Sequence, residues 1–312
     1  MLGSTTCEAC YLQIYVDIVI KRPLDEIWRY TQTPELHERW DLRFFKITYL
    51  QRPDPTLPQQ FEYKTRIGFG TEIRGAGETT ASKEDRSGAR TSALRFWSDD
   101  PKSLIKSGSG YWRYEPAADG VRFITGYDYA TRFGVLGKVF DALAFRPLLG
   151  WATAWSFDRL RLWLESDVEP AAAGQRALIN MLARGSIAFA FLYQGLVPKL
   201  LFADADERQM MLAAGVAASA IPESLRALGV AEIAFAVVSL MAWRSRWPLV
   251  LAMILMIVAT TVVAVTSPQY FFRAFNPVVL NILIAVLSCI GLVASRNIPT
   301  SRACLRRPEK SP

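Results

Sequence analysis

The first half of the chain alternates apolar and polar side chains with a period of two. In residues 60–69, aromatic and β-branched residues occupy every second position, and mainly charged or amide residues lie between them. Such alternation predicts a strand with one apolar face. Strands are expected at residues 11–20, 44–50, 60–69, 71–83, 90–97, 107–116 and 121–129. The turn sequences DRSG, SDDP and AADG separate several of them, so we expect an antiparallel meander rather than βαβ units.

Three helical segments accompany these strands. Short helices are expected near Pro23 and Pro34, because proline is well tolerated in the first turn of a helix. A long helix is expected at residues 137–165, with a kink or a restart at Pro147. The small-residue sequence SDVEPAAAG follows it. We therefore interpret residues 11–166 as a soluble domain and residues 167–176 as a linker.

The second half contains runs that are apolar on every face. Four of them, at residues 183–202, 225–243, 247–266 and 276–295, approach the roughly 20 residues that cross a hydrocarbon core. The run at 183–202 is the weakest because it contains Arg184, Gln194 and Lys199. The apolar centre of residues 204–224 is too short to span, so a surface or re-entrant helix is expected there. The sequence thus predicts an all-α four-helix transmembrane domain at residues 177–296.

Charge supports this division and excludes one class of partner. Residues 1–170 contain 23 Lys+Arg and 23 Asp+Glu, which leaves 13 basic and 6 acidic residues of the totals of 36 and 29 for the apolar half. A nucleic-acid-binding protein would carry a basic stripe on its soluble part. We therefore expect the lipid bilayer as a partner and no nucleic acid.

The basic residues of the second half also predict its orientation. Arg244 and Arg246 lie between the second and third runs, and the tail at 297–312 is basic, whereas the loop before the fourth run has only Arg273. Basic loops favour the cytoplasmic side. The first ten residues lack the basic and apolar regions of a cleaved signal peptide. We expect a multi-pass protein of the inner cell membrane with both termini in the cytoplasm.

The sequence DIVIKRPLDEIWRYTQTPELHERW, followed by the meander and by RPLLGWATAWSFDRLRLWLE, resembles the START-like (SRPBCC) superfamily, which includes polyketide cyclases and lipid-transfer domains. The resemblance spans roughly residues 11–166 and rests on packing residues rather than on a catalytic motif. It implies an α+β helix-grip fold, in which an antiparallel sheet wraps around a long C-terminal helix and leaves a ligand cavity between them.

Alternating aromatic and aliphatic residues supply candidates for the lining of that cavity. They are Phe61, Tyr63, Ile67, Ile73, Phe96, Tyr111, Thr125, Tyr127 and Trp155. For each of them alone, filling a core is the favoured interpretation, since alternating apolar residues are core residues first. As a group they would suit an apolar small molecule such as a lipid, a quinone or a polyketide-like compound.

Catalytic and metal-binding motifs are missing from the sequence. His37 is the sole histidine, so a Ser-His-Asp or Cys-His arrangement would need it, and the spacing of Asp41, Glu62 and Arg95 does not single them out. The lone CxxC of Cys7 and Cys10 has no partner pair for zinc. We predict no catalytic residue, metal or cofactor and favour binding over catalysis. The alternative is cyclase or hydrolase chemistry that uses His37 or a carboxylate in the same cavity.

Ionisable residues inside the apolar runs form a second candidate site. Lys199 and Glu232 lie at similar depth near the outer ends of the first two runs, and Pro198 frees the carbonyl group of Gln194. Gln194, Lys199 and Glu232 either form a polar site for a small polar or quinone-like molecule, or simply pair and tie two helices together. The second interpretation is favoured, because intramembrane charges generally pair.

RGSIAFAFLYQGLVPKLLF, an interhelical segment and LGVAEIAFAVVSL resemble the DoxX-like family of small four-helix membrane proteins. The Gly-x-x-Pro-Lys and Gly-x-x-Glu sequences carry this resemblance, which spans about residues 177–296. It implies a link to membrane oxidoreductase complexes, so an accessory subunit of such a complex is a further alternative. These runs contain no histidine to ligate haem, and we expect no haem chemistry of their own.

Overall fold

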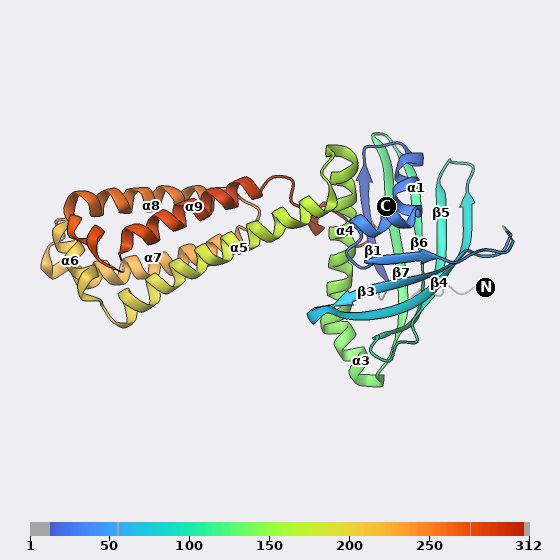
Figure 1. Ribbon diagram of the computed structural model, residues 1–312, viewed down its shortest axis with the longest axis horizontal. Helices are drawn as coiled ribbons and strands as arrows, with labels where there is room; N and C mark the ends of the chain where they lie inside the picture. Colours follow the sequence, from blue (N-terminus) through green and yellow to red (C-terminus); the bar gives the residue numbers. More distant parts are fainter. Residues whose placement is uncertain (1–12, 55, 275, 309–312) are drawn as a thin grey trace, which may run out of the picture. The chain divides into compact units, whose positions relative to one another are not determined.

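The computed structural model describes residues 13–54, 56–274 and 276–308. The chain divides into two compact units (Figure 1). The first unit contains the chain up to Ala173 together with the segment from Pro299, and the second is Gly174–Ile298. The CxxC of Cys7 and Cys10 lies outside the described residues, as does the start of the strand expected at 11–20.

A seven-stranded antiparallel sheet forms most of the first unit. Its strands are β1 (Ile14–Ile20), β2 (Lys46–Tyr49), β3 (Gln60–Ile67), β4 (Thr71–Glu84), β5 (Arg90–Trp97), β6 (Ile105–Ala117) and β7 (Gly120–Thr131). Their order is β1-β7-β6-β5-β4-β3-β2, so the strands from β2 to β7 form a meander and β1 pairs with the last of them. Gly75 and Gly77 on β4 lie under the rings of Tyr63 and Phe61, where a Cβ atom would collide. These glycines let the two aromatic rings lie flat across the sheet.

The helices of the first unit follow the predicted order. Helices α1 (Leu24–Gln32) and α2 (Pro34–Trp40) begin beside Pro23 and at Pro34. The expected long helix is divided into α3 (Gly134–Phe140), a π-helical turn η3 (Asp141–Phe145) and α4 (Arg146–Ser166), with Pro147 in the first turn of α4. Phe157 on α4 stacks on Phe123 of β7 with ring centroids 4.3 Å apart. The α+β helix-grip fold is confirmed.

Two segments that were expected to be a linker and a tail differ from that expectation. Helix α5 (Pro170–Gln194) begins inside the predicted linker 167–176, because Glu169 accepts hydrogen bonds from the backbone amides of Ala171 and Ala172. Alanine is also the best helix former. The start of the basic tail packs on the first unit: Leu305 exchanges two 3.0 Å backbone hydrogen bonds with Asp17 of β1. The first unit is therefore built from two segments that are far apart in the sequence.

The second unit is helical. After α5 come the π-helical η4 (Gly195–Leu201), α6 (Ala205–Ala213), α7 (Ile221–Met241), α8 (Trp247–Thr266) and α9 (Pro277–Ala294). Three helical segments among the described residues, Ala218–Met241, Trp247–Thr266 and Pro277–Ala294, are long and apolar enough to cross a membrane. Pro170–Leu201 and Ala205–Ala213 form a broken pair bent by 94°, so the four spans of the prediction are reached only if this pair counts as one span.

The apolar surface of these helices faces outward. The shares of their apolar windows that are buried within the unit are 22%, 17% and 28%. In water such exposure would be costly, whereas hydrocarbon solvates it. A smaller core, formed by Ile187, Phe191, Leu249, Ala252 and Ile284 together with Ala188 and Ala236, holds the helices together.

Candidate functional site

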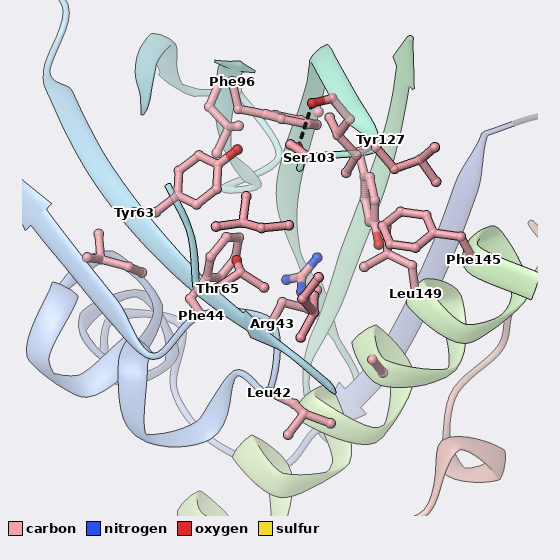
Figure 2. Close-up of a pocket in the computed structure, with 18 of the residues that line it drawn as sticks. Leu42, Arg43, Phe44, Tyr63, Thr65, Phe96, Ser103, Tyr127, Phe145 and Leu149 are labelled. Atoms are coloured by element: carbon pink, nitrogen blue, oxygen red, sulfur yellow. Dashed lines mark hydrogen bonds between the residues drawn. The ribbon is translucent and has the colours of Figure 1, made fainter. Parts of the chain in front are cut away.

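The first unit contains an open cavity of about 840 Å³. Its walls are strands of the sheet, the segment after α2, and the region from α3 to α4 (Figure 2). Apolar and aromatic side chains dominate the lining, which also includes polar side chains such as His37, Arg43 and Thr125. Size and composition match those of ordinary small-molecule sites, which occupy roughly 300–1,000 Å³.

The structure brings eight of the nine predicted lining residues to this cavity: Phe61, Tyr63, Ile67, Ile73, Phe96, Tyr111, Thr125 and Tyr127. The ninth, Trp155, does not line it. It lies about one helical turn beyond the lining residue Ala152, stacks on Trp151 with ring centroids 6.2 Å apart, and carries the Arg159 guanidinium 5.0 Å above its own ring. Helical spacing alone could not show where along α4 the cavity ends. Ligand binding by the other eight residues stays a prediction.

An ionic cluster that the sequence did not reveal lies at the cavity wall. Asp41 follows the end of α2, and the Nε and Nη2 atoms of Arg43 donate to its two carboxylate oxygens at 2.9 and 2.6 Å. The Nε2 atom of His37, one turn earlier on α2, lies 2.9 Å from the same carboxylate. Arg43 and His37 line the cavity, and Figure 2 shows the Arg43 guanidinium pointing into it.

The electrostatics of this cluster follow from burial and pairing. The Asp41 side chain is fully buried and that of Arg43 is 11% exposed. Burial by itself would raise the pKa of Asp41, but the charge and hydrogen bonds of Arg43, with His37, outweigh it and hold that pKa far below its usual range. The same pairing raises the pKa of Arg43 although burial opposes it. The pair therefore stays ionised at neutral pH.

The ring of His37 is fixed by aromatic neighbours. It stacks on Trp40 with centroids 4.9 Å apart, and Trp112 meets it edge-on at 4.9 Å. With Nε2 directed at Asp41, Nδ1 is the ring nitrogen left for other contacts, and among the described residues it has no hydrogen-bond partner. A histidine that is oriented by a carboxylate in this way can act as a general base or acid.

Two hydroxyl groups extend the polar part of the wall. The Arg43 guanidinium lies 5.5 Å from the centre of the Tyr127 ring, and the Tyr127 hydroxyl lies 2.7 Å from that of Thr153 on α4. Burial raises the pKa of Tyr127, so its phenol stays neutral and available as a hydrogen-bond donor. Sequence reasoning named Tyr127 but not Arg43 or Thr153. The Asp-x-Arg spacing directly after α2 was the one signal present for Arg43.

The predicted intramembrane residues also meet. The Lys199 Nζ atom is 3.2 Å from Glu232 Oε2 and donates to the backbone carbonyl of Gln194 at 3.4 Å. That carbonyl is the acceptor which Pro198 frees. Glu207 of α6 lies nearer still, at 2.9 Å, and was not predicted because it comes from a segment that does not span. Gln194 thus contributes its backbone carbonyl group, not its side chain, to the contacts of Lys199.

Two glycines explain why these charges meet. A Cβ atom on Gly195 would lie 2.5 Å from the carbonyl oxygen of Gly229, and one on Gly229 would lie 2.8 Å from that of Gly195. The backbones of η4 and α7 touch at this point, as small residues allow in membrane helices. Lys199 and Glu232 follow the glycines by four and three positions, which is about one helical turn, and so lie side by side.

Comparison with known proteins agrees with this division. Residues 11–165 match the family described as polyketide cyclase / dehydrase and lipid transport, and residues 188–289 match the DoxX-like family. The uncharacterized membrane protein YndG of Bacillus subtilis is 49% identical over 183 residues, which are 58% of this chain and 68% of YndG. The chain belongs to the YndG family. The two expected resemblances are confirmed, and the chain is a membrane protein that joins a polyketide cyclase-like domain to a DoxX-like domain.

Solved structures resemble about half of this member of the YndG family. TTHA0849 of Thermus thermophilus is 14% identical (49% of this chain and 99% of that chain, TM-score 0.37). The di-domain ARO/CYC StfQ of the steffimycin pathway is 15% identical (50% and 51%, TM-score 0.40). A STAR-related lipid transfer protein of Xanthomonas axonopodis is 15% identical (49% and 85%, TM-score 0.39).

The second unit contains another buried cation, Arg184. Arg184 is 1% exposed, and its Nε atom donates to the Asn180 side-chain oxygen at 3.1 Å. Its two terminal nitrogens donate to the backbone carbonyls of Ala242 and Ser245, just after α7. A cation at the C-terminal end of a helix satisfies carbonyl groups that lack intrahelical partners. Within the described residues, no group of three or more His, Cys, Asp or Glu side chains is placed to hold a metal ion.

Proposed function

We propose that the polyketide cyclase-like domain binds one apolar, lipid-like molecule, with a polar end, that comes from the bilayer to which the chain is anchored. The observation that carries this proposal is the cavity of about 840 Å³, lined largely by apolar and aromatic side chains, in a chain that also has membrane helices. A membrane-associated ligand-binding protein is what the two domains together support.

The polar groups support one orientation of such a ligand. Arg43, His37 and Tyr127 converge at the cavity wall, while the remaining lining is mainly apolar. A site of this kind fixes a ligand by a few polar contacts and gains most of its affinity from apolar burial. A carboxylate, carbonyl or hydroxyl end would therefore lie at Arg43 and His37, and the hydrocarbon part or ring system would lie along Phe61, Tyr63 and Phe96.

The location of the binding domain is part of the proposal. Arg244 and Arg246 precede α8, and the positive-inside rule assigns that loop to the cytoplasm of a cell with an inner membrane. The polyketide cyclase-like domain would then also be cytoplasmic. Cysteine accessibility in intact cells tests this orientation separately from ligand binding.

The binding test uses the full chain, because the segment from Pro299 packs on the soluble unit. Native mass spectrometry and lipid extraction of the purified protein should reveal one co-purified lipophilic molecule. Ala152 lines the cavity, and Ala152→Trp should reduce uptake of the fluorescent fatty acid cis-parinaric acid at least about tenfold by filling the site. Ala118→Trp, in the exposed β6–β7 turn, is the matched control and should bind normally. A wild-type protein that binds neither lipid nor probe would contradict the proposal.

The His37–Asp41 pair favours a second candidate, acid–base catalysis in the same cavity. If Nε2–H donates to Asp41, Nδ1 can accept the α-proton of a β-hydroxyketone and then return that proton to the departing hydroxyl group, which leaves as water and yields an enone. An aromatic β-hydroxyketone reports this dehydration by absorbance. His37→Gln should abolish turnover and weaken probe binding much less, because apolar burial supplies most of the affinity. Equal rates in wild type and His37→Gln would exclude His37 as the catalyst.

A further inference from the structure

The segment of residues 133–151, called the lip below, exposes an unusual amount of apolar surface for the soluble unit. It comprises α3, η3 and the start of α4, and Figure 1 shows α3 at one end of that unit. Leu136 is 82% exposed and Leu143 is 79% exposed. Its exposed large apolar residues are Phe133, Val135, Leu136, Val139, Phe140, Leu143, Leu148 and Trp151. Contiguous exposed apolar surface of this kind marks a site that another apolar phase covers.

A helix of a water-soluble domain normally turns its apolar side toward the core, whereas the lip turns its apolar side outward. Asp141 faces the body of the domain, where the Tyr129 hydroxyl donates to it at 2.6 Å and Arg146 Nε donates at 2.9 Å. Gly137 is buried beside Arg132 of the β7 end. The charged group thus faces inward, where it is paired, and the leucine, valine and phenylalanine side chains face outward. The paired Asp141 anchors the lip in this orientation.

The exposed face of the lip is continuous with the cavity. Five of its exposed residues, Phe133, Leu136, Phe140, Leu148 and Trp151, also line the cavity. Ile67, at the end of β3, is 40% exposed and lines it as well. An apolar molecule could therefore move from a phase that covers the lip to the cavity without crossing water. Water would otherwise impose a transfer cost of about 0.8 kcal/mol per CH₂ group.

The charged side chains of the cavity lining have one sign. Arg43, Arg66 and Lys102 are charged residues of the lining, and no carboxylate group belongs to it within the part of the chain that the structure describes. Arg43 is neutralised by Asp41, whereas Arg66 stacks on the Phe45 ring at 4.2 Å and Lys102 donates to the backbone carbonyl of Glu72 at 3.4 Å. Lys138 adds a further cation on the lip itself. A negatively charged surface would complement these cations.

We infer that the lip is a docking surface for an anionic lipid leaflet, into which Leu136, Leu143 and their neighbours insert. The soluble domain is covalently joined to membrane helices, so its surroundings include a bilayer, and acidic lipids complement the cations of the cavity lining. Interfacial helices bury apolar side chains about 5–10 Å into the headgroup and acyl boundary. This inference extends the proposed function by naming the route of entry, and its test needs no ligand.

The test measures the depth of the lip in the full chain. Cys7 and Cys10 are changed to Ser and Cys289 to Ala, and the buried Cys304 is kept because burial raises its pKa and makes it a poor nucleophile. Leu136→Cys is then labelled with bimane in nanodiscs that hold one copy each. Leu57→Cys, 50% exposed on a loop outside the cavity lining, is the matched control. Circular dichroism verifies that both variants are folded.

In nanodiscs of phosphatidylglycerol, nitroxide-labelled lipids should quench the label at residue 136 and not the label at residue 57, while aqueous iodide should show the opposite order. Nanodiscs of phosphatidylcholine alone should show weaker quenching at residue 136. A label at residue 136 that iodide reaches as freely as residue 57 would overturn the inference. Equal lipid quenching in both compositions would overturn its electrostatic part. A protein that binds cis-parinaric acid but keeps residue 136 in water would refute the docking surface and leave the proposed function standing.

Discussion

Both domains bury ionisable side chains, but they hold them by different means. In the polyketide cyclase-like domain, His37, Asp41 and Arg43 come from seven consecutive positions, and the end of α2 directs them to one another. In the DoxX-like domain, Lys199 and Glu232 come from η4 and α7, and a backbone contact between two glycines brings them together. Pairing in the first case is local, whereas in the second it depends on helix packing. The two clusters should therefore fail in different ways.

The two clusters also differ in how many carboxylates contact the buried cation. Among the described residues, Asp41 is the only carboxylate that contacts the Arg43 guanidinium, which donates two hydrogen bonds to it. Lys199 has both Glu207 and Glu232. Removing one acid leaves a buried cation without its partner in the first domain but not in the second. The variants below test this contrast.

The largest effect is expected for Asp41→Asn. It leaves the buried Arg43 without its counter-charge, and breaking a buried pair from one side costs about 3–5 kcal/mol. Tryptophan fluorescence during urea unfolding should report this loss, since Trp40 and Trp112 flank the cluster. Asp119→Asn, in an exposed pair with Lys21, is the control and should change stability little. Similar stability of both variants would show that the cluster does not stabilise the domain.

Gly229→Ala should destabilise the DoxX-like domain next. Its methyl group would meet the Gly195 carbonyl oxygen at 2.8 Å, and overpacking of this kind costs about 1–3 kcal/mol. Unfolding by SDS in mixed micelles, followed by helicity, measures the loss. Gly185→Ala, on α5 with open space around it, should be neutral or stabilising. An unchanged Gly229→Ala variant would mean that the two backbones are not in contact.

A smaller effect is expected from pH. The folded pKa of Asp41 is depressed, so its contribution is complete above the unfolded value of about 3.9 and is lost as pH falls toward the folded pKa. Between pH 5 and pH 3 the wild type should lose about 1 kcal/mol relative to Asp41→Asn. Comparing the two proteins cancels the titration of other carboxyl groups. A constant difference across this range would contradict a depressed pKa.

The smallest effect is expected for Glu232→Gln. Polar contacts between membrane helices contribute about 0.6 kcal/mol on average, and Lys199 keeps Glu207 at 2.9 Å. The double variant Glu207→Gln/Glu232→Gln should lose more than the sum of the single variants, because Lys199 then lacks both carboxylates. The same SDS titration measures this coupling. Strict additivity would show that the two acids act independently of Lys199.

Most of the fold was predictable because its signals are local. Alternation predicted all seven strands, and the turn sequences predicted their antiparallel order, within a few residues of the observed bounds. Eight of the nine proposed lining residues reach the cavity for the same reason, since a strand presents every second residue to one face. Trp155 does not line the cavity, because helical periodicity predicts which face of α4 a residue lies on but not where along the helix a cavity ends.

What the sequence by itself determined is the type of each half: a strand meander followed by a long helix, and then apolar runs that belong in a membrane. The period of the hydrophobic pattern and the length of the apolar runs contain that information, because both reflect whether a side chain faces water, a protein core or hydrocarbon. Only the tertiary structure decided that His37 and Arg43 face the cavity while both contact the buried Asp41. It also decided that Glu207 joins Lys199, that the C-terminal segment packs on β1, and that the lip turns its apolar side outward. These features depend on contacts between residues distant in the chain or on the direction of single side chains, and neither leaves a period in the sequence.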